Sequence, residues 1–280
     1  MIITNIREGP VINAITVDVE EWYQTILFNR NNNAEDSLIT NLQNNINDIL
    51  LLLDEYNTKA TFFIVASLAV KYPKLIKIIF DKGHEICCHN YYHRLVYKMS
   101  KKEFSDDIGL SLDILRKNTN KEILGFRAPS WSIIKDSHWA IDILHSYGLK
   151  YDSSIYPINF NLLHYKNYKR LPYRIKEDFI EFPPSTFKFL GNNLPFAGGI
   201  FMRFLHSSFI INKIREINDE GNPAMIYFHS WEFDRKTPSM IYKKWKRLIQ
   251  YGNLSSIRDK IKLLLENFKF CPIKDILQIK

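Results

Sequence analysis

Two histidines lie four residues apart at the end of an apolar run, in the sequence GHEICCHNYYHRL of residues 83–95. One helical turn, or a tight loop after a strand, would direct the imidazoles of His89 and His93 toward one point. Two neutral imidazoles that converge in this way form half of a common zinc site. The chain has 8 histidines, so one such spacing also arises readily by chance. The pair alone is therefore only a weak indication of metal binding.

Several other short apolar segments also end in residues that can do chemistry. Five such segments end at Asp18, His89, Arg127, Asp152 and His229. If the segments are parallel strands, their carboxyl ends meet at one rim, where catalytic residues collect in barrel enzymes. Asp18 and Glu20 are two residues apart in an extended chain, so their carboxylates face one side while Val19 faces the other. The sequence therefore predicts a cluster of acids and imidazoles at one end of a barrel.

The elements that must position these residues alternate along the chain. Apolar and β-branched runs predict strands at 11–19, 60–65, 84–88, 123–126, 149–151, 180–186 and 224–228. Helical spacing predicts helices at 38–56, 69–82, from Ser100 onward, 137–147, 207–220 and within 242–279. Such alternation implies a mainly parallel sheet with helices outside. We expect an α/β barrel, complete or incomplete, in one domain over 1–280, with the catalytic barrel at about 11–235 and a helical extension at about 240–280.

Composition excludes several classes of protein. The hydrophobic fraction of 46% and the charged fraction of 24% are ordinary for a soluble globular protein. The net charge is +8, but the basic residues are scattered, and the densest run is KKWKR at 243–247, so no nucleic-acid partner is expected. The 3 cysteines form no Cys-x-x-Cys pair, which favours a reducing compartment. No signal-peptide pattern and no apolar run of about 18 residues occurs, so a cytoplasmic location is expected.

The residue types at the strand ends suit one kind of reaction. Two imidazoles and one carboxylate complete a three-ligand metal site with an open position for water. The metal lowers the pKa of that water toward about 7 and polarises a carbonyl oxygen. A second carboxylate can accept the proton of the water, and a separate histidine can protonate the leaving group. The set predicts metal-assisted hydrolysis of an amide or an ester.

Seven ordered motifs carry a family resemblance that spans about residues 14–265: TVDVEEWYQ, GHEICCHNYYHRLVY, GFRAPSWSI, YDSSIYPI, EFPPST, NLPFAGG and YFHSWEFD. The chain resembles the polysaccharide deacetylases of the NodB-homology class, the family-four carbohydrate esterases. Within them it is most similar to the cytoplasmic branch found with exopolysaccharide and exosortase loci. The resemblance implies a distorted (β/α)7 barrel. It also implies removal of N-acetyl groups from amino sugars of a cell-surface polysaccharide or its lipid-linked precursor, by attack of metal-activated water on the amide carbonyl.

The resemblance also implies a ligand set for the metal. His89 and His93 stand at the histidine ligands of the family, and Asp18 stands at its general base. The family's common acidic motif has two adjacent aspartates, of which the second binds metal, but Val19 stands there in this chain. Glu20 is the expected third ligand; the reverse assignment, with Asp18 on the metal and Glu20 as base, stays open. Zn2+ is the expected metal, although Co2+, Fe2+ and Ni2+ suit the same ligands.

Further roles follow from the same resemblance. Arg127 would hold Asp18 ionised and oriented, and Asp152 would support His229 as the general acid. The backbone N–H of Ser130 would help the metal to bind the oxyanion. The branch usually has proline after the acid histidine, and Ser230 in its place is expected to loosen the strand end.

Three tryptophans, Trp22, Trp131 and Trp231, lie beside the motifs, where each could stack on a sugar ring or fill the core. The implied partner is an N-acetylated glycan, and the basic surface suits peripheral association with the anionic inner face of a membrane. The sequence does not indicate the oligomeric state. Two other functions stay open: hydrolysis of another amide, such as a cyclic imide or ureide, and a non-catalytic sugar-binding module. The change from adjacent aspartates to Asp-Val-Glu is the only sequence support for the module.

Overall fold

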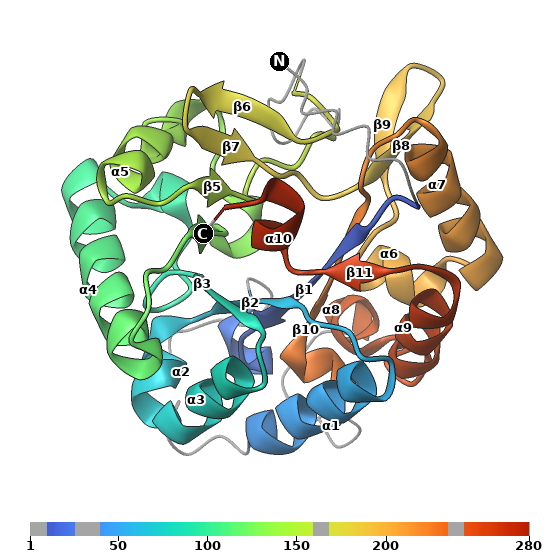
Figure 1. Ribbon diagram of the computed structural model, residues 1–280, viewed down its shortest axis with the longest axis horizontal. Helices are drawn as coiled ribbons and strands as arrows, with labels where there is room; N and C mark the ends of the chain where they lie inside the picture. The colour runs from blue at the N-terminus through green and yellow to red at the C-terminus, as the bar shows by residue number, and fades with distance from the viewer. Residues whose placement is uncertain (1–9, 26–39, 159–167, 235–243, 280) are drawn as a thin grey trace.

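The computed structural model describes residues 10–25, 40–158, 168–234 and 244–279, and it shows a curved sheet with helices packed outside it (Figure 1). The parallel strands follow the order β10-β1-β2-β3-β4-β5-β7, and β6 lies antiparallel beside β7. These strands are β1 (Asn13–Val19), β2 (Thr61–Ile64), β3 (Glu85–Cys88), β4 (Gly125–Phe126), β5 (Tyr151–Asp152), β6 (Tyr173–Lys176), β7 (Phe179–Glu181) and β10 (Met225–His229). The prediction of a mainly parallel sheet in an α/β barrel is therefore confirmed.

The barrel is incomplete between β7 and β10, the two ends of the parallel order. One edge of β10 pairs with β1, whereas Gly198 bridges to Tyr227 at its other edge. A Cβ atom on Gly198 would lie 2.3 Å from the Tyr227 ring, so this close approach of two backbones requires glycine. The hairpin of β8 (Thr186–Phe189) and β9 (Asn192–Pro195) forms a separate two-stranded sheet. The distortion of the barrel thus lies where an irregular segment takes the place of a regular strand.

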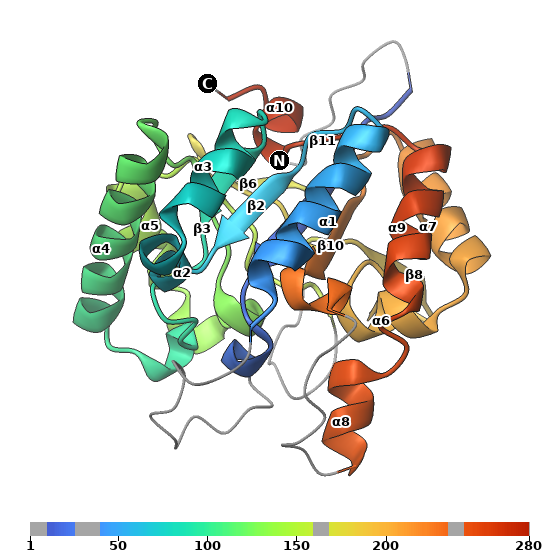
Figure 2. The ribbon, with the colours of Figure 1, turned by 90° about the horizontal axis from the view of Figure 1, so that it is seen from below.

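Helices cover the outer face of the sheet (Figures 1 and 2). The α-helices of the described residues are α1 (Leu42–Glu55), α2 (Ala66–Lys71), α3 (Pro73–Asp81), α4 (Lys101–Thr119), α5 (Ala140–Ser146), α6 (Gly199–Phe204), α7 (Ser207–Asp219), α8 (Lys244–Tyr251), α9 (Ser256–Asn267) and α10 (Ile273–Leu277), of which α8 and α10 lie away from this face. The prediction of one helix over 69–82 is wrong. Pro73 begins α3 at the first helical position, where its missing N–H costs nothing. The helix is therefore interrupted just before Pro73. Ser100 caps α4 together with Glu103, as predicted.

The end of the chain takes part in the barrel. Strand β11 (Phe270–Cys271) pairs with the start of β1, which the prediction of a helical extension did not include. Ile273, two residues after this strand, is buried inside the barrel, and its N–H donates to the hydroxyl of Thr61 at the start of β2. Helix α10 therefore lies at the amino ends of the strands, over the middle of the ring in Figure 1. The carboxyl ends of the strands form the opposite rim, where the candidate site lies.

None of the helices in the part of the chain that the structure describes has the length and apolar character needed to cross a membrane.

Candidate metal centre and active site

The strand ends enclose a pocket of about 250 Å3, called here the rim pocket. Its lining includes Asp18, Glu20, His89, His93 and His229. The parallel register places Asp18 of β1 directly beside His229 of β10. Residues far apart in sequence thus meet because parallel strands end at the same rim.

Glu20, His89 and His93 form a group whose ligand atoms all lie within 4.8 Å of one another. Oε2 of Glu20 contacts Nε2 of His93 and lies 3.8 Å from Nε2 of His89. Nδ1 of His89 is 2.6 Å from the carbonyl oxygen of Arg127; because a carbonyl only accepts, Nδ1 carries the hydrogen. Nε2 of His89 then keeps its lone pair toward Glu20, as metal-ligating histidines require. The three residues fit a divalent metal with one carboxylate and two imidazole ligands.

The loop that carries both histidines is not helical. Asn90 and His93 have φ angles of 61° and 55°, in the left-handed region that residues with a side chain seldom adopt. The side chain of Asn90 donates to the carbonyl of Arg94, and the N–H of Tyr91 donates to Asp107 at 2.8 Å. Of the two arrangements open from the spacing, the structure therefore has the tight loop, held by polar contacts on both sides.

Glu20, and not Asp18, faces the two imidazoles. Val19 is fully buried in the core, which turns Glu20 toward the rim pocket. Nε1 of Trp231 donates to Oε1 of Glu20 at 2.9 Å and fixes the carboxylate. Burial raises the pKa of Glu20, but the neighbouring His93 and His89 more than offset it, so the pKa lies well below its ordinary value. An ionised carboxylate is the form that binds a metal.

Asp18 is paired with Arg127. Nη1 of Arg127 donates to Oδ1 of Asp18 at 2.6 Å and to the hydroxyl of Thr16 at 2.9 Å. Nε and Nη2 donate to the carbonyl and hydroxyl oxygens of Ser153, so the buried guanidinium is held by β1 and by the residue after β5. The contact between Arg127 and Asp18 that the resemblance implied is present.

Replacing Arg127 with Ala is expected to lower the free energy of unfolding by about 3–5 kcal/mol, because it leaves Asp18 buried and unpaired. Urea denaturation measures this difference. The control is Arg94→Ala, which removes a half-exposed pair with Glu103 at 3.1 Å and is expected to cost less than about 1 kcal/mol. Equal losses for both variants would show that the Asp18–Arg127 pair has no special part in the fold.

His229 is supported by Glu232 and not by Asp152. Nδ1 of His229 lies 3.0 Å from Oε2 of Glu232, and Oε1 of Glu232 lies 2.9 Å from Nε of Arg203. Burial alone would lower the pKa of His229, but the anionic Glu232 and Glu20 raise it to about 9. Nε2 of His229 lies 4.0 Å from Oε1 of Glu20 and faces the rim pocket. The imidazole is therefore protonated at neutral pH. Its Nε2 points toward the group of Glu20, His89 and His93.

Asp152 lies elsewhere, so the predicted contact with His229 is wrong. It is fully buried at the end of β5, and the strands from β4 to β1 separate it from β10 in the sheet order. Its Oδ1 accepts the hydroxyl of Ser154 at 2.5 Å, and Oε1 of the neighbouring Glu181 accepts the N–H of Ile155 at 3.0 Å. Burial raises the pKa of Asp152 to about 6 and that of Glu181 well above its ordinary value. Two neighbouring carboxyl groups buried together both resist ionisation.

Ser230 tightens the strand end that it was expected to loosen. Its hydroxyl donates to the carbonyl of Glu20 at 2.7 Å and accepts the N–H of Glu20 at 3.1 Å. The side chain thus joins the end of β10 to the residue after β1. Proline has no hydroxyl and could not make this bridge. The serine therefore helps to fix the backbone of the expected metal ligand.

The three tryptophans differ in their surroundings. Trp22 is 1% exposed and packs with Tyr23 and Trp231 outside the pocket lining, so it is a core residue and not a sugar-binding surface. Trp231 is also buried; its ring stacks on His229 at 5.2 Å and its N–H holds Glu20. Trp131 is half-buried and lines the rim pocket, as does the exposed Ser130. Trp131 and Trp231 therefore both line the rim pocket, and Trp131 is the more exposed of the two.

Sequence reasoning missed Glu232 and Arg203. Glu232 follows His229 by three residues, which is the spacing of a capping box, and its Oε2 also accepts the N–H of His229 at 2.9 Å. That spacing could have revealed Glu232. Arg203 has no such signal, because α6 brings it to Glu232 only in the folded chain.

Comparison with known proteins divides the chain into two matched parts. Residues 33–151 match the family model described as polysaccharide deacetylase, and residues 153–278 match a domain of unknown function, DUF3473. The chain is 30% identical over 107 residues to a peptidoglycan deacetylase of Helicobacter pylori, covering 38% of this chain and 36% of that protein. It is 32% identical over 95 residues to a peptidoglycan-N-acetylglucosamine deacetylase of Bacillus cereus, covering 34% of each. The chain thus spans about a third of the length of these curated relatives.

Solved structures share the fold over nearly the whole chain. A candidate polysaccharide deacetylase from Mycobacterium smegmatis has a TM-score of 0.66 at 19% identity, covering 99% of this chain and 92% of that one. A CE4-family pseudoenzyme from Bacillus anthracis has a TM-score of 0.54 at 14% identity, covering 97% and 66%. The fold is therefore that of the CE4 deacetylase structures, the distorted barrel of the NodB type. Residues 33–151 are thus similar to the polysaccharide deacetylase family, and a match to the domain of unknown function follows them.

Proposed function

We propose that the protein is a metal-dependent hydrolase that removes N-acetyl groups from amino sugars of a glycan. The observation that carries the proposal is the group of Glu20, His89 and His93, which faces His229 across one small pocket. The fold alone could not carry it, because a pseudoenzyme shares the fold. The names of the relatives, which are deacetylases of peptidoglycan, support an N-acetylated glycan as substrate.

The residues of the pocket divide the reaction between them. A divalent metal held by Glu20, His89 and His93, which we propose to be zinc, would polarise the acetyl carbonyl and acidify a water molecule. Asp18, held by Arg127, accepts a proton from the water that adds to the carbonyl carbon. His229 donates its proton to the nitrogen of the sugar as the C–N bond breaks. Acetate and a free amino sugar leave.

The surroundings of the pocket also favour a sugar substrate. The half-buried ring of Trp131 lies in the lining, which also includes Gly199 and Ile200 of α6. Aromatic rings offer an apolar face for the C–H groups of a sugar. We propose that the glycan is a cell-surface polysaccharide or its lipid-linked precursor, with one acetamido group in the pocket.

Acetate release tests the proposal. Purified protein loaded with zinc is expected to release acetate from oligomers of N-acetylglucosamine, and protein treated with a chelator is expected to release none until zinc is restored. A cyclic imide and a ureide serve as comparison substrates. Turnover of these compounds without acetate release from any glycan would assign the barrel to another amide. Metal binding with no turnover of any substrate would instead indicate a sugar-binding module.

A further inference from the structure

Helix α8 presents its apolar face outward. Trp245, Leu248 and Ile249 lie at i, i+3 and i+4 on one face, and they are 56%, 60% and 36% exposed. The buried residue of the helix is Gln250, whose amide donates to the carbonyl of Trp22. A helix on the surface of a globular protein normally buries its apolar stripe and exposes its polar side chains. The reversed arrangement indicates that the outer face has a partner of its own.

Helix α6 extends the apolar surface. Phe201 and Phe204 are 39% and 52% exposed and lie three residues apart on one helix face. A Cβ atom on Gly252, which follows α8, would lie 2.6 Å from the ring of Phe204, so the two elements touch. We call Phe201, Phe204, Trp245, Leu248 and Ile249 the α8–α6 patch. Ile249 also lines the rim pocket, so the patch reaches the edge of the candidate active site.

Positive charge accompanies the apolar face. Lys244, Lys246 and Arg247 lie on α8, which has no acidic residue. The ammonium of Lys246 lies 5.7 Å from the centre of the Trp245 ring. Lysine and arginine can lie with their stems along apolar surface and their charges at lipid headgroups, and tryptophan is favoured at the membrane interface. A short helix with these residues matches the chemistry of an anionic lipid surface.

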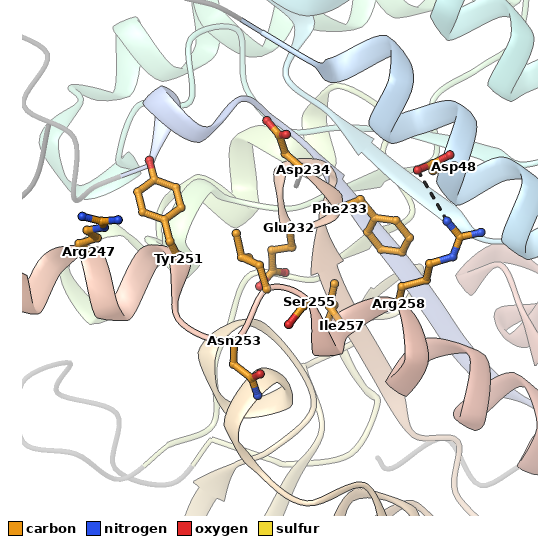
Figure 3. A pocket seen from close by; sticks show the side chains of 11 residues that line it. Asp48, Glu232, Phe233, Asp234, Arg247, Tyr251, Asn253, Ser255, Ile257 and Arg258 are labelled. Atoms are coloured by element: carbon orange, nitrogen blue, oxygen red, sulfur yellow. Dashed lines mark ion pairs between the residues drawn. The ribbon is translucent and has the colours of Figure 1, made fainter. Parts of the chain in front are cut away.

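The helix stands away from the barrel on its other side. A cavity of about 470 Å3 lies beside it, lined by Arg247 and Tyr251 of α8 and, across the opening, by Asp48 and Arg258, which are 3.7 Å apart (Figure 3). Figure 2 shows α8 projecting beyond the helices of the barrel. Its carboxyl end is anchored, because Arg203 donates to the carbonyls of Ile249, Gln250 and Gly252. Helix α8 is thus anchored at its carboxyl end and projects from the barrel.

We propose that the α8–α6 patch docks on an anionic lipid bilayer and holds the rim pocket at the membrane surface. Trp245 and Leu248 enter the headgroup region, while Lys244 and Lys246, which flank them on the helix, meet the lipid phosphates. Arg203 links this surface to the candidate active site, because the same guanidinium holds the end of α8 and lies against Glu232. The docking itself does not depend on the proposed function. Only its consequence rests on that function: the rim pocket would meet a lipid-linked glycan at the level of the headgroups.

Sedimentation with vesicles tests the docking. The full chain is expected to pellet with phosphatidylcholine vesicles that contain about a third phosphatidylglycerol, and to bind pure phosphatidylcholine about tenfold less. The double variants Trp245→Ser/Leu248→Ser and Lys244→Glu/Lys246→Glu are each expected to weaken the binding about tenfold or more. Brominated lipids are expected to quench the tryptophan fluorescence of the wild type and not of Trp245→Phe.

Matched controls lie on α4, which is remote from α8 (Figure 1). Leu110→Ser replaces an apolar residue that is 48% exposed, and Lys101→Glu reverses an exposed charge; both are expected to bind vesicles like the wild type. Wild-type protein that stays in the supernatant, or patch variants that bind as well as the controls, would overturn the proposal. A wild-type dimer that the patch variants convert to monomer, without vesicle binding, would assign the patch to a second copy. Vesicle binding needs no turnover, so a protein that binds vesicles but releases no acetate contradicts the proposed function alone.

Discussion

Glu20→Gln is expected to lose the metal, whereas Asp18→Asn is expected to keep the metal and lose turnover. Glu20 is the carboxylate that contacts the imidazole of His93, and a neutral amide in its place is a far weaker ligand. Because even supporting residues around a metal change its affinity by about 10- to 100-fold, the loss of a direct ligand should exceed about 100-fold. Metal analysis of the purified variants after dialysis, beside acetate release, measures both effects.

The result for Asp18→Asn separates the two assignments that the sequence left open. As general base, Asp18 should contribute about 10²- to 10⁴-fold to the rate with no effect on metal content. If Asp18 is instead the ligand, the two variants will exchange their behaviour. Glu21→Gln is the matched control on the same loop: Glu21 is buried, lies outside the pocket lining and has a pKa that burial raises to about 7. We expect Glu21→Gln to retain both metal and activity.

Glu232→Gln is expected to move the alkaline limb of the pH–rate profile to lower pH. The active form of His229 carries the proton, and activity falls as the pH rises through its pKa, which is about 9 beside the anionic Glu232 and Glu20. Removing the charge of Glu232 lowers that pKa, so the fall begins at a lower pH. His229→Ala is expected to lower the rate by about 10²- to 10⁴-fold while the metal stays bound.

Asp152→Asn is the comparison that decides which acid supports His229. Its carboxylate binds Ser154 and lies beside Glu181, so the alkaline limb of this variant should stay in place. A shift for Asp152→Asn and none for Glu232→Gln would restore the arrangement that the family resemblance implied. Circular dichroism of each variant confirms that a change in rate reflects the site and not a loss of fold.

Some features of the site were already present in local sequence patterns. Apolar runs that end in Asp18, His89 and His229 predicted both the parallel strands and their common rim, because burial on two faces demands such runs. Period-two alternation separated Glu20 from Val19, and the structure confirms that they face opposite sides. These features depend on neighbours in the chain, which the sequence shows directly. The cytoplasmic location and the identity of the metal stay predictions.

Other features depended on which elements meet in space. The family resemblance assigned Asp152 as the partner of His229, but in the sheet order β1, β2, β3 and β4 lie between β5 and β10. Trp22 and Trp131 each flank a motif, yet only packing decides that one is core and the other lines the pocket. Strand β11 is only two residues long, so no hydrophobic periodicity could predict it. It forms because the start of β1 is available to pair with it.

The histidine pair shows what the sequence determines and what the tertiary structure decides. Its spacing allowed either a helical turn or a loop, and a four-residue spacing alone occurs readily by chance. The structure decides for the loop, since left-handed residues at Asn90 and His93 are held by contacts to α4 and to the chain after β3. The sequence by itself thus determined which residue types reach the rim. Only the tertiary structure decided their partners, because hydrogen bonds and ion pairs depend on distances between segments that are remote along the chain.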